Sequence, residues 1–271
     1  MKRRMMLYFG SFNPVHNGHT ALAEMVIERD LCDELAMIVS PRNPLKEDSM
    51  LAAELDRFSM AEAACAASRY PERIKASAVE FLLPRPSYTI DTLRYLEQTC
   101  GQRMQFSILM GADLVLTLDR WKEGGAILDR YPIYVYPRTG YDVSGIDSRV
   151  HYLADAPVFD YSSTDVRKTL RSGGDASSMI APGVLKYIGE KGLWSTEEYL
   201  GQLDDMIAGN PSDTESLMER GRLFYRRNKW GEALNDFGRV LELQPGNVEA
   251  SRMREMINEI LEFRYTDIYN P

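Results

Sequence analysis

The strongest constraint on the fold is an alternation of short apolar runs with amphipathic stretches up to about residue 190. Apolar runs of strand length cover residues 5–9, 35–40, 105–110 and 133–136. Stretches with helical periodicity lie between them, for example at residues 51–68 and 89–99. Strands that alternate with helices pair in parallel, because each crossover helix returns the chain to the same end of the sheet. The pattern therefore predicts an α/β domain with a doubly wound parallel sheet.

The segment after the first apolar run holds two of the three histidines of the chain and reads YFGSFNPVHNGH over residues 8–19. A strand that stops at Gly10 and Ser11 lets the backbone approach an anionic ligand. His16 and His19 then fall one turn apart at the start of a helix, where imidazoles, neutral or charged, and free N–H groups can bind phosphate oxygens. The segment therefore predicts a nucleotide phosphate site. Zinc binding is an alternative, but no cysteine or carboxylate cluster follows at ligand spacing.

This segment resembles the G-x-F-x-P-x-H-x-G-H signature of nucleotidyltransferases that join a small phosphorylated molecule to a nucleotide triphosphate. A second motif, DYSSTDVR at residues 160–167, resembles the ISST-x-x-R element that holds the β- and γ-phosphates of ATP in that family, with Tyr161 in place of an aliphatic residue. Serine and threonine at a helix start are ordinarily caps. Arg167 favours a phosphate site, because it lies one turn into the helix and can reach the same oxyanions.

Two more segments indicate one branch of this superfamily. PSYTIDTL at residues 86–93 resembles the SYT-x-D-T-L segment of bacterial nicotinate mononucleotide adenylyltransferases, and MGAD (110–113) followed by LDRW (118–121) resembles the same enzymes. The resemblance covers residues 4–194. It implies a Rossmann-like nucleotidyltransferase fold and transfer of AMP from ATP to nicotinate mononucleotide in NAD biosynthesis. Nicotinamide mononucleotide or phosphopantetheine as the acceptor, and an inactive nucleotide-binding module, remain alternatives.

The resemblance also implies a role for each motif residue. The catalytic residues are expected to be His16, His19 and Arg167. The expected ATP contacts are Gly10, Ser11, Phe12, His16, His19, Gly111, Asp113, Ser162, Ser163, Thr164 and Arg167. The expected contacts of the mononucleotide are Asn43, Lys46, Tyr88, Thr89, Trp121 and Arg138. Mg²⁺ is expected to arrive with ATP, and no protein ligands are predicted for it because this ion is usually held by few of them.

Three of these assignments have structural alternatives. Asp113 follows a predicted strand, where it can accept ribose hydroxyls or simply cap a helix. Trp121 is either a stacking ring for the pyridine base or a core residue. Lys46 is either a substrate contact or a solvated lysine.

Composition narrows the range of partners and compartments. The net charge of −8 argues against nonspecific nucleic-acid binding, which needs a basic excess. No apolar run approaches the roughly 18 residues that cross a bilayer, so no membrane partner is expected. Cys32, Cys65 and Cys100 are widely spaced and indicate buried thiols in a reducing cytoplasm. His151 stands alone in a polar stretch and is interpreted as structural or exposed.

After residue 194 the pattern changes to helices only, which predicts a catalytic domain over residues 1–194 and an all-α domain over 195–271. Residues 214–247 resemble one tetratricopeptide repeat. Its small and apolar positions hold Leu217, Gly221, Phe224, Ala233, Phe237 and Pro245. Helices are expected on either side, at residues 195–208 and 247–263. Since an independent solenoid needs about three repeats, we expect a stabilising appendage, with a homo-oligomer or a protein partner as alternatives.

Overall fold

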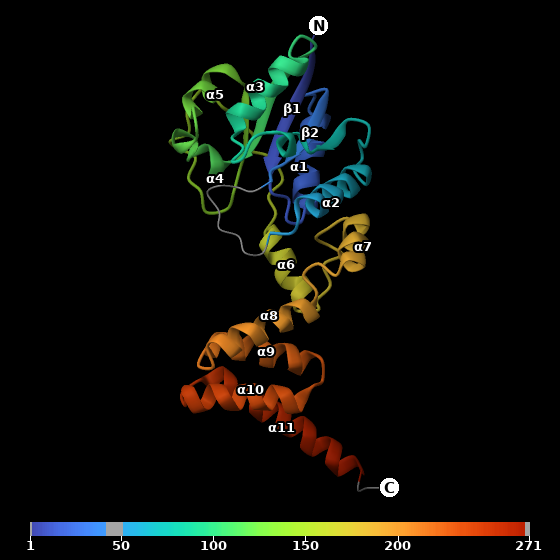
Figure 1. Ribbon diagram of the computed structural model, residues 1–271, viewed down its shortest axis with the longest axis vertical. Coiled ribbons are helices and arrows are strands. Elements are labelled where there is room, and N and C mark those ends of the chain that lie inside the picture. The colour runs from blue at the N-terminus through green and yellow to red at the C-terminus, as the bar shows by residue number, and fades with distance from the viewer. Residues whose placement is uncertain (1, 42–50, 269–271) are drawn as a thin grey trace. The chain divides into compact units, whose positions relative to one another are not determined.

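The computed structural model describes residues 2–41 and 51–268, with side chains up to residue 261 (Figure 1). The chain divides into two compact units. One contains Met1–Thr169 and Asp175–Lys191, and the other contains Leu170–Gly174 and Gly192–Pro271. The predicted substrate contacts Asn43 and Lys46 lie outside the described residues.

The first unit contains a six-stranded parallel sheet in the order β3-β2-β1-β4-β5-β6. Its strands are β1 (Arg3–Gly10), β2 (Glu34–Val39), β3 (Ile74–Ser77), β4 (Met104–Gly111), β5 (Ile133–Tyr136) and β6 (His151–Tyr152). The predicted doubly wound sheet is therefore confirmed. The order reverses between β1 and β4, and ligands of open α/β sheets bind beyond the carboxyl ends of the strands at such a switch point.

Two of the six strands were not predicted. β3 and β6 are short edge strands, and a run of two to four residues is too brief to show a period in the sequence. His151 lies in β6, is exposed, and stacks its ring on Tyr134 of β5 at a centroid distance of 4.9 Å.

The helical segments before residue 192 are α1 (Asn17–Glu28), α2 (Glu54–Ala66), η1 (Val79–Leu82), α3 (Thr89–Cys100), α4 (Ala112–Val115), η2 (Leu118–Arg120), α5 (Gly124–Arg130), α6 (Ser163–Arg171) and α7 (Pro182–Lys191). Figure 1 shows α3, α4 and α5 on one side of the sheet and α1 and α2 on the other. α1 follows β1 after a short turn, and α4 follows β4 directly, so both helices begin at the switch point.

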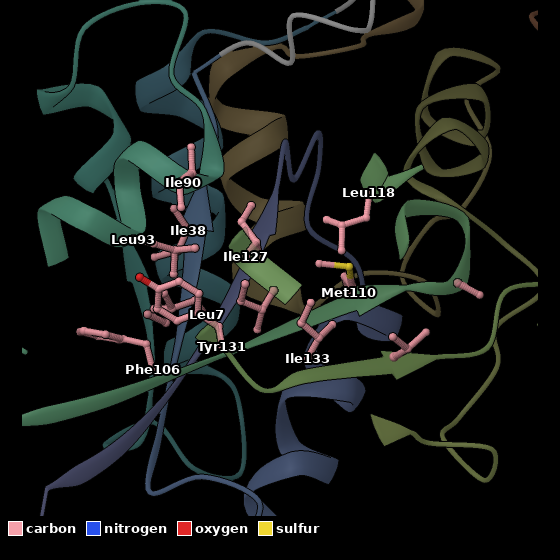
Figure 2. Packing of buried hydrophobic residues seen from close by; sticks show 14 residues of the cluster. Leu7, Ile38, Ile90, Leu93, Phe106, Met110, Leu118, Ile127, Tyr131 and Ile133 are labelled. Carbon is pink, nitrogen blue, oxygen red and sulfur yellow. The ribbon is translucent and has the colours of Figure 1, made fainter. Parts of the chain in front are cut away.

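A buried apolar cluster fixes the central strands against α3 and α5 (Figure 2). Leu7 of β1 and Ile133 of β5 belong to it, together with Ile90 and Leu93 of α3 and Ile127 of α5. Burying each such side chain stabilises the fold by about 1.5–3 kcal/mol. The carboxyl ends of β1 and β4 are therefore rigid platforms for the segments that follow them.

The second unit is helical, with α8 (Thr196–Gly209), α9 (Thr214–Arg226), α10 (Trp230–Leu243) and α11 (Val248–Ile268). α9 and α10 pack closely because Gly221 faces Phe237, and a Cβ at residue 221 would lie 2.8 Å from that ring. Arg220 of α9 adds a bidentate ion pair with the buried Asp236 of α10, at 2.6 and 2.9 Å. The expected helices at residues 195–208 and 247–263 are α8 and α11, and α11 is longer than predicted.

The thiols differ in burial. Cys32 and Cys65 are buried, as predicted. The prediction is wrong for Cys100, which is only partly buried because it is the last residue of α3, where the helix leaves the core. Among the helices of the described residues, none is long and apolar enough to cross a membrane.

Candidate active site

The two histidines of the first motif form the start of α1. His16 is the N-cap residue, and its Nδ1 accepts a hydrogen bond from the Gly18 N–H at 3.1 Å. Nδ1 of His19 accepts one from the backbone N–H of His16, also at 3.1 Å, and the two ring centroids are 3.7 Å apart. Because both Nδ1 atoms are acceptors, each neutral imidazole carries its proton on Nε2. The helix cap thus selects the tautomer that presents an Nε2–H donor.

The surroundings keep both imidazoles neutral at pH 7. Burial, and then the nearby Arg138 guanidinium, lower the pKa of His16 to about 4. Burial, His16 and Arg138 lower the pKa of His19 well below its usual value. The sequence left open whether the imidazoles are neutral or charged. The structure favours neutral hydrogen-bond donors rather than cations.

Phe12 supports the histidines from inside the turn. Its backbone has a φ of +48°, in the left-handed region, and its buried ring meets the His19 ring edge-on at a centroid distance of 5.2 Å. A non-glycine residue in this region costs about 1–3 kcal/mol and persists only where packing enforces it. A Cβ at Gly10 would lie 2.9 Å from the same ring. Gly10 is therefore needed to admit Phe12, a role that the sequence did not reveal.

The second motif lies directly against the first. The Ser163 hydroxyl donates to the Pro14 carbonyl at 2.8 Å, and the buried Arg167 donates from Nη1 to the Asn13 carbonyl at 2.7 Å. Nη2 of Arg167 donates to the Thr164 hydroxyl at 3.2 Å. The start of α6 and the turn after β1 therefore form one structure, although about 150 residues separate them in the sequence.

A cavity of about 450 Å³ lies beside the histidines. Five of the predicted site residues line it, and these are His16, His19, Asp113, Arg138 and Ser162. Arg138 Nε lies 3.5 Å from Asp113 Oδ1, and a Cβ at Gly111 would come within 2.3 Å of that oxygen. Gly111 therefore leaves room for the carboxylate. Arg138, expected at the mononucleotide, lines the same cavity as residues expected at ATP.

Several residues of this cavity were not predicted from the sequence. The missed residues with clear contacts are Tyr8, Tyr136, Phe159, Tyr161 and Asp165. The Tyr8 and Tyr136 hydroxyls are 3.1 Å apart, and burial raises the pKa of both. Asp165 accepts from the backbone N–H and the hydroxyl of Ser162, at 2.9 and 2.6 Å. No local pattern marks the tyrosines, because only the sheet brings β1 and β5 near the same ligand site.

The remaining predicted contacts form a second group around the start of α3. Tyr88 is the N-cap residue and Thr89 begins the helix. Lys122 lies with its Nζ 4.9 Å from the Tyr88 ring centroid and bonds to Asp91 at 2.8 Å, which places the segment of Trp121 beside that of Tyr88. The segments that carry Tyr88, Thr89 and Trp121 are thus adjacent in the fold. These three residues are not among those that line the cavity beside the histidines.

Comparison with known proteins shows the family to which the chain belongs. Residues 7–169 match the cytidylyltransferase-like family. A probable nicotinate-nucleotide adenylyltransferase of Bacteroides fragilis (strain YCH46) is 40% identical over 189 residues, which cover 69% of this chain and 92% of that protein. A probable nicotinate-nucleotide adenylyltransferase of Flavobacterium johnsoniae is 36% identical over 185 residues, which cover 67% of this chain and 94% of that protein.

A solved structure has the same fold. The Plasmodium falciparum nicotinic acid mononucleotide adenylyltransferase complexed with NaAD matches with a TM-score of 0.58 and covers 71% of this chain and 97% of that chain. Its sequence identity of 18% limits the comparison to the fold. The sheet order, the paired histidines and the two sequence relatives agree, so the chain belongs to the cytidylyltransferase-like family and, within it, to the nicotinate-nucleotide adenylyltransferases.

Proposed function

We propose that this protein transfers AMP from ATP to nicotinate mononucleotide, which yields nicotinate adenine dinucleotide and pyrophosphate in NAD biosynthesis. The observation that carries the proposal is the pairing of two neutral Nε2–H donors, from His16 and His19, with the Ser163 and Arg167 element at the switch point of the sheet. The names of the two sequence relatives support the same reaction.

The reaction needs alignment of two anionic substrates more than it needs a protein nucleophile. A phosphate oxygen of nicotinate mononucleotide attacks the α-phosphorus of ATP, and the bond from that phosphorus to the bridging oxygen breaks as pyrophosphate leaves. His16 and His19 donate hydrogen bonds to the α-phosphate oxygens as charge develops on them. Ser163, Thr164 and Arg167 bind the departing pyrophosphate.

The cavity beside the histidines accepts the adenosine half of ATP in this proposal. Asp113 accepts ribose hydroxyls, and Arg138 faces the phosphates from the same wall. Mg²⁺ enters as part of the substrate, bound to ATP oxygens. This ion is usually held by few protein ligands, so we assign it none.

The acceptor occupies the second group of residues, with Tyr88 and Thr89 as backbone donors and Trp121 as a stacking ring. An amide and a carboxylate differ by one donor group, so this group decides between the nicotinamide and nicotinate mononucleotides.

Pyrophosphate release from MgATP tests the proposal, with nicotinate mononucleotide, nicotinamide mononucleotide and phosphopantetheine as separate acceptors. We expect a strong preference for the nicotinate form. Preference for another acceptor would keep the chemistry and change the substrate, whereas no release with any acceptor, in protein that binds ATP, would support an inactive binding module.

We also propose that the second unit is a tetratricopeptide-like appendage. The close packing of Gly221 against Phe237 supports this, since repeats of this kind place a small residue where two helices meet. The buried free thiols Cys32 and Cys65 support a reducing, cytoplasmic location.

A further inference from the structure

Arg57 of α2 is fully buried next to the site and donates to four backbone carbonyls. Nη1 donates to Ser11 at 2.7 Å and to Ser40 at 2.6 Å, Nη2 to Pro41 at 2.5 Å, and Nε to Ala52 at 3.0 Å. Ser11 belongs to the turn after β1, while Ser40 and Pro41 follow β2. One guanidinium therefore holds together the ends of two neighbouring strands.

Glu80 of η1 is a second buried charged residue, 3% exposed. Its carboxylate accepts from the Thr92 hydroxyl at 2.9 Å and from the Ser87 hydroxyl at 3.4 Å. Burial raises the pKa of this carboxyl, and the side chains of Thr92, Ser40 and Ser87 act in the opposite direction. Ser87 and Thr92 flank the N-cap of α3, where Tyr88 and Thr89 lie. Glu80 therefore fixes the segment that we assign to the mononucleotide.

Ser40 lies between the two groups, since its carbonyl accepts from Arg57 and its side chain lowers the pKa of the Glu80 carboxyl. We infer that Arg57 and Glu80 are positioning residues that act as one brace, with Arg57 fixing the phosphate-binding turn and Glu80 fixing the start of α3. The inference rests on the proposed function, because it assigns these two segments to the two substrates of that reaction.

Stability alone gives little reason for this arrangement. The hydrogen-bond acceptors of Arg57 are backbone carbonyls, and the partners of Glu80 are hydroxyls. None of these contacts is an ion pair that would offset the desolvation cost of burying the two groups. Apolar residues of similar volume usually fill a core at lower cost. The planar guanidinium has donors in a rigid geometry, so it fixes the positions of several acceptors at once. Such fixed geometry is what alignment of two anionic substrates requires.

The test combines steady-state kinetics for both substrates with thermal unfolding of the full chain. The variants are Arg57→Met and Glu80→Leu, which remove the hydrogen bonds, and the conservative Arg57→Lys and Glu80→Gln. Arg73→Met is the matched control, because Arg73 also donates to backbone carbonyls, Cys32 at 3.0 Å and Asp33 at 2.8 Å, but at the opposite end of β2.

We expect Arg57→Met to lower kcat by at least about tenfold, since displacements of about 1 Å can cost up to about a hundredfold. Glu80→Leu should raise the KM for nicotinate mononucleotide by about tenfold and leave the KM for ATP within about twofold, on the same argument. Glu80→Gln keeps the shape of the side chain and can still accept from hydroxyls, so its KM for nicotinate mononucleotide should be close to that of the wild type. Arg57→Lys should remain defective because an ammonium group lacks the rigid geometry of the guanidinium. Arg73→Met should lower the Tm and leave the kinetics unchanged.

Wild-type kinetic constants in Arg57→Met and Glu80→Leu, with a Tm loss like that of Arg73→Met, would overturn the inference. If the apolar variants fail to fold, Arg57→Lys decides instead, and a folded protein with wild-type kcat would overturn the role of Arg57. Glu80→Gln folded with a defect as large in the KM for ATP as in that for the mononucleotide would overturn the role of Glu80. A wild-type protein that makes no dinucleotide would instead refute the proposed function, which the wild-type assay reveals independently.

Discussion

The ring of His19 can make two hydrogen bonds, and substitutions at this residue can test each of them. Nδ1 accepts the backbone N–H of His16 and completes the cap of α1, while the Nε2–H is the proposed donor to the α-phosphate. Asparagine places an acceptor near the Nδ1 position and glutamine places a donor near the Nε2 position. His19→Asn should therefore keep the cap and lose the donor, whereas His19→Gln should keep both, because glutamine at this third position of the helix can also accept the N–H of the N-cap residue.

The two losses differ in size. Removing one donor to a developing oxyanion costs about 2.7–4 kcal/mol, or a factor of about 100–1,000 in kcat. Removing one helix-cap hydrogen bond costs about 1 kcal/mol of stability, which lowers the Tm of a domain of this size by about 2–4 °C. His19→Asn should thus be nearly as stable as wild type and at least about a hundredfold slower.

The assay measures kcat by pyrophosphate release and the Tm by thermal unfolding for His19→Asn, His19→Gln and His19→Ala. His19→Gln should melt close to His19→Asn, because both side chains can accept the cap N–H, and it should retain more activity. A His19→Asn protein that is folded and retains more than about a third of the wild-type kcat would refute the donor role, because losing an oxyanion donor leaves about a hundredth or less. Activities that simply follow the Tm across the three variants would show that His19 acts through the cap alone.

Three further results are expected. Because burial holds the folded pKa of His16 at about 4, below about 6.5 in the unfolded chain, its contribution to stability is complete above pH 6.5 and is lost as the pH falls toward 4. Urea unfolding should show this as a loss of at least about 3 kcal/mol over that range. The lowered pKa of His19 adds to the loss, so His16→Gln should reduce it without abolishing it. Gly221→Ala places a methyl group 2.8 Å from the Phe237 ring and should destabilise the second unit by about 1–3 kcal/mol; an unchanged Tm would contradict the packing, and kcat should not move. Deletion of residues 195–271 removes the Tyr199 ring that lies 5.2 Å from the Arg171 guanidinium, so the Tm should fall while most of the specific activity remains, and a well-folded but inactive truncation would place the helices in the catalytic mechanism.

The fold was largely predictable because its signals are local. Apolar runs and helical periods depend on neighbouring residues, and the strand at residues 133–136 has the predicted limits. β3 and β6 escaped because edge strands of two to four residues take their structure from pairing with β2 and β5 rather than from their own pattern.

The site was predictable only in part. The sequence by itself determined two motifs, one with His16 and His19 and one with Ser163 and Arg167, and that each motif lies at the start of a helix. Motif and cap spacing are properties of a short segment. Only the tertiary structure decided that the imidazoles are neutral Nε2–H donors and that α6 lies on the turn after β1. It also decided that Arg57 bonds to the turn after β1 and Glu80 to the start of α3. Burial and hydrogen-bond direction depend on partners far apart in the chain, and no local pattern of residues encodes them.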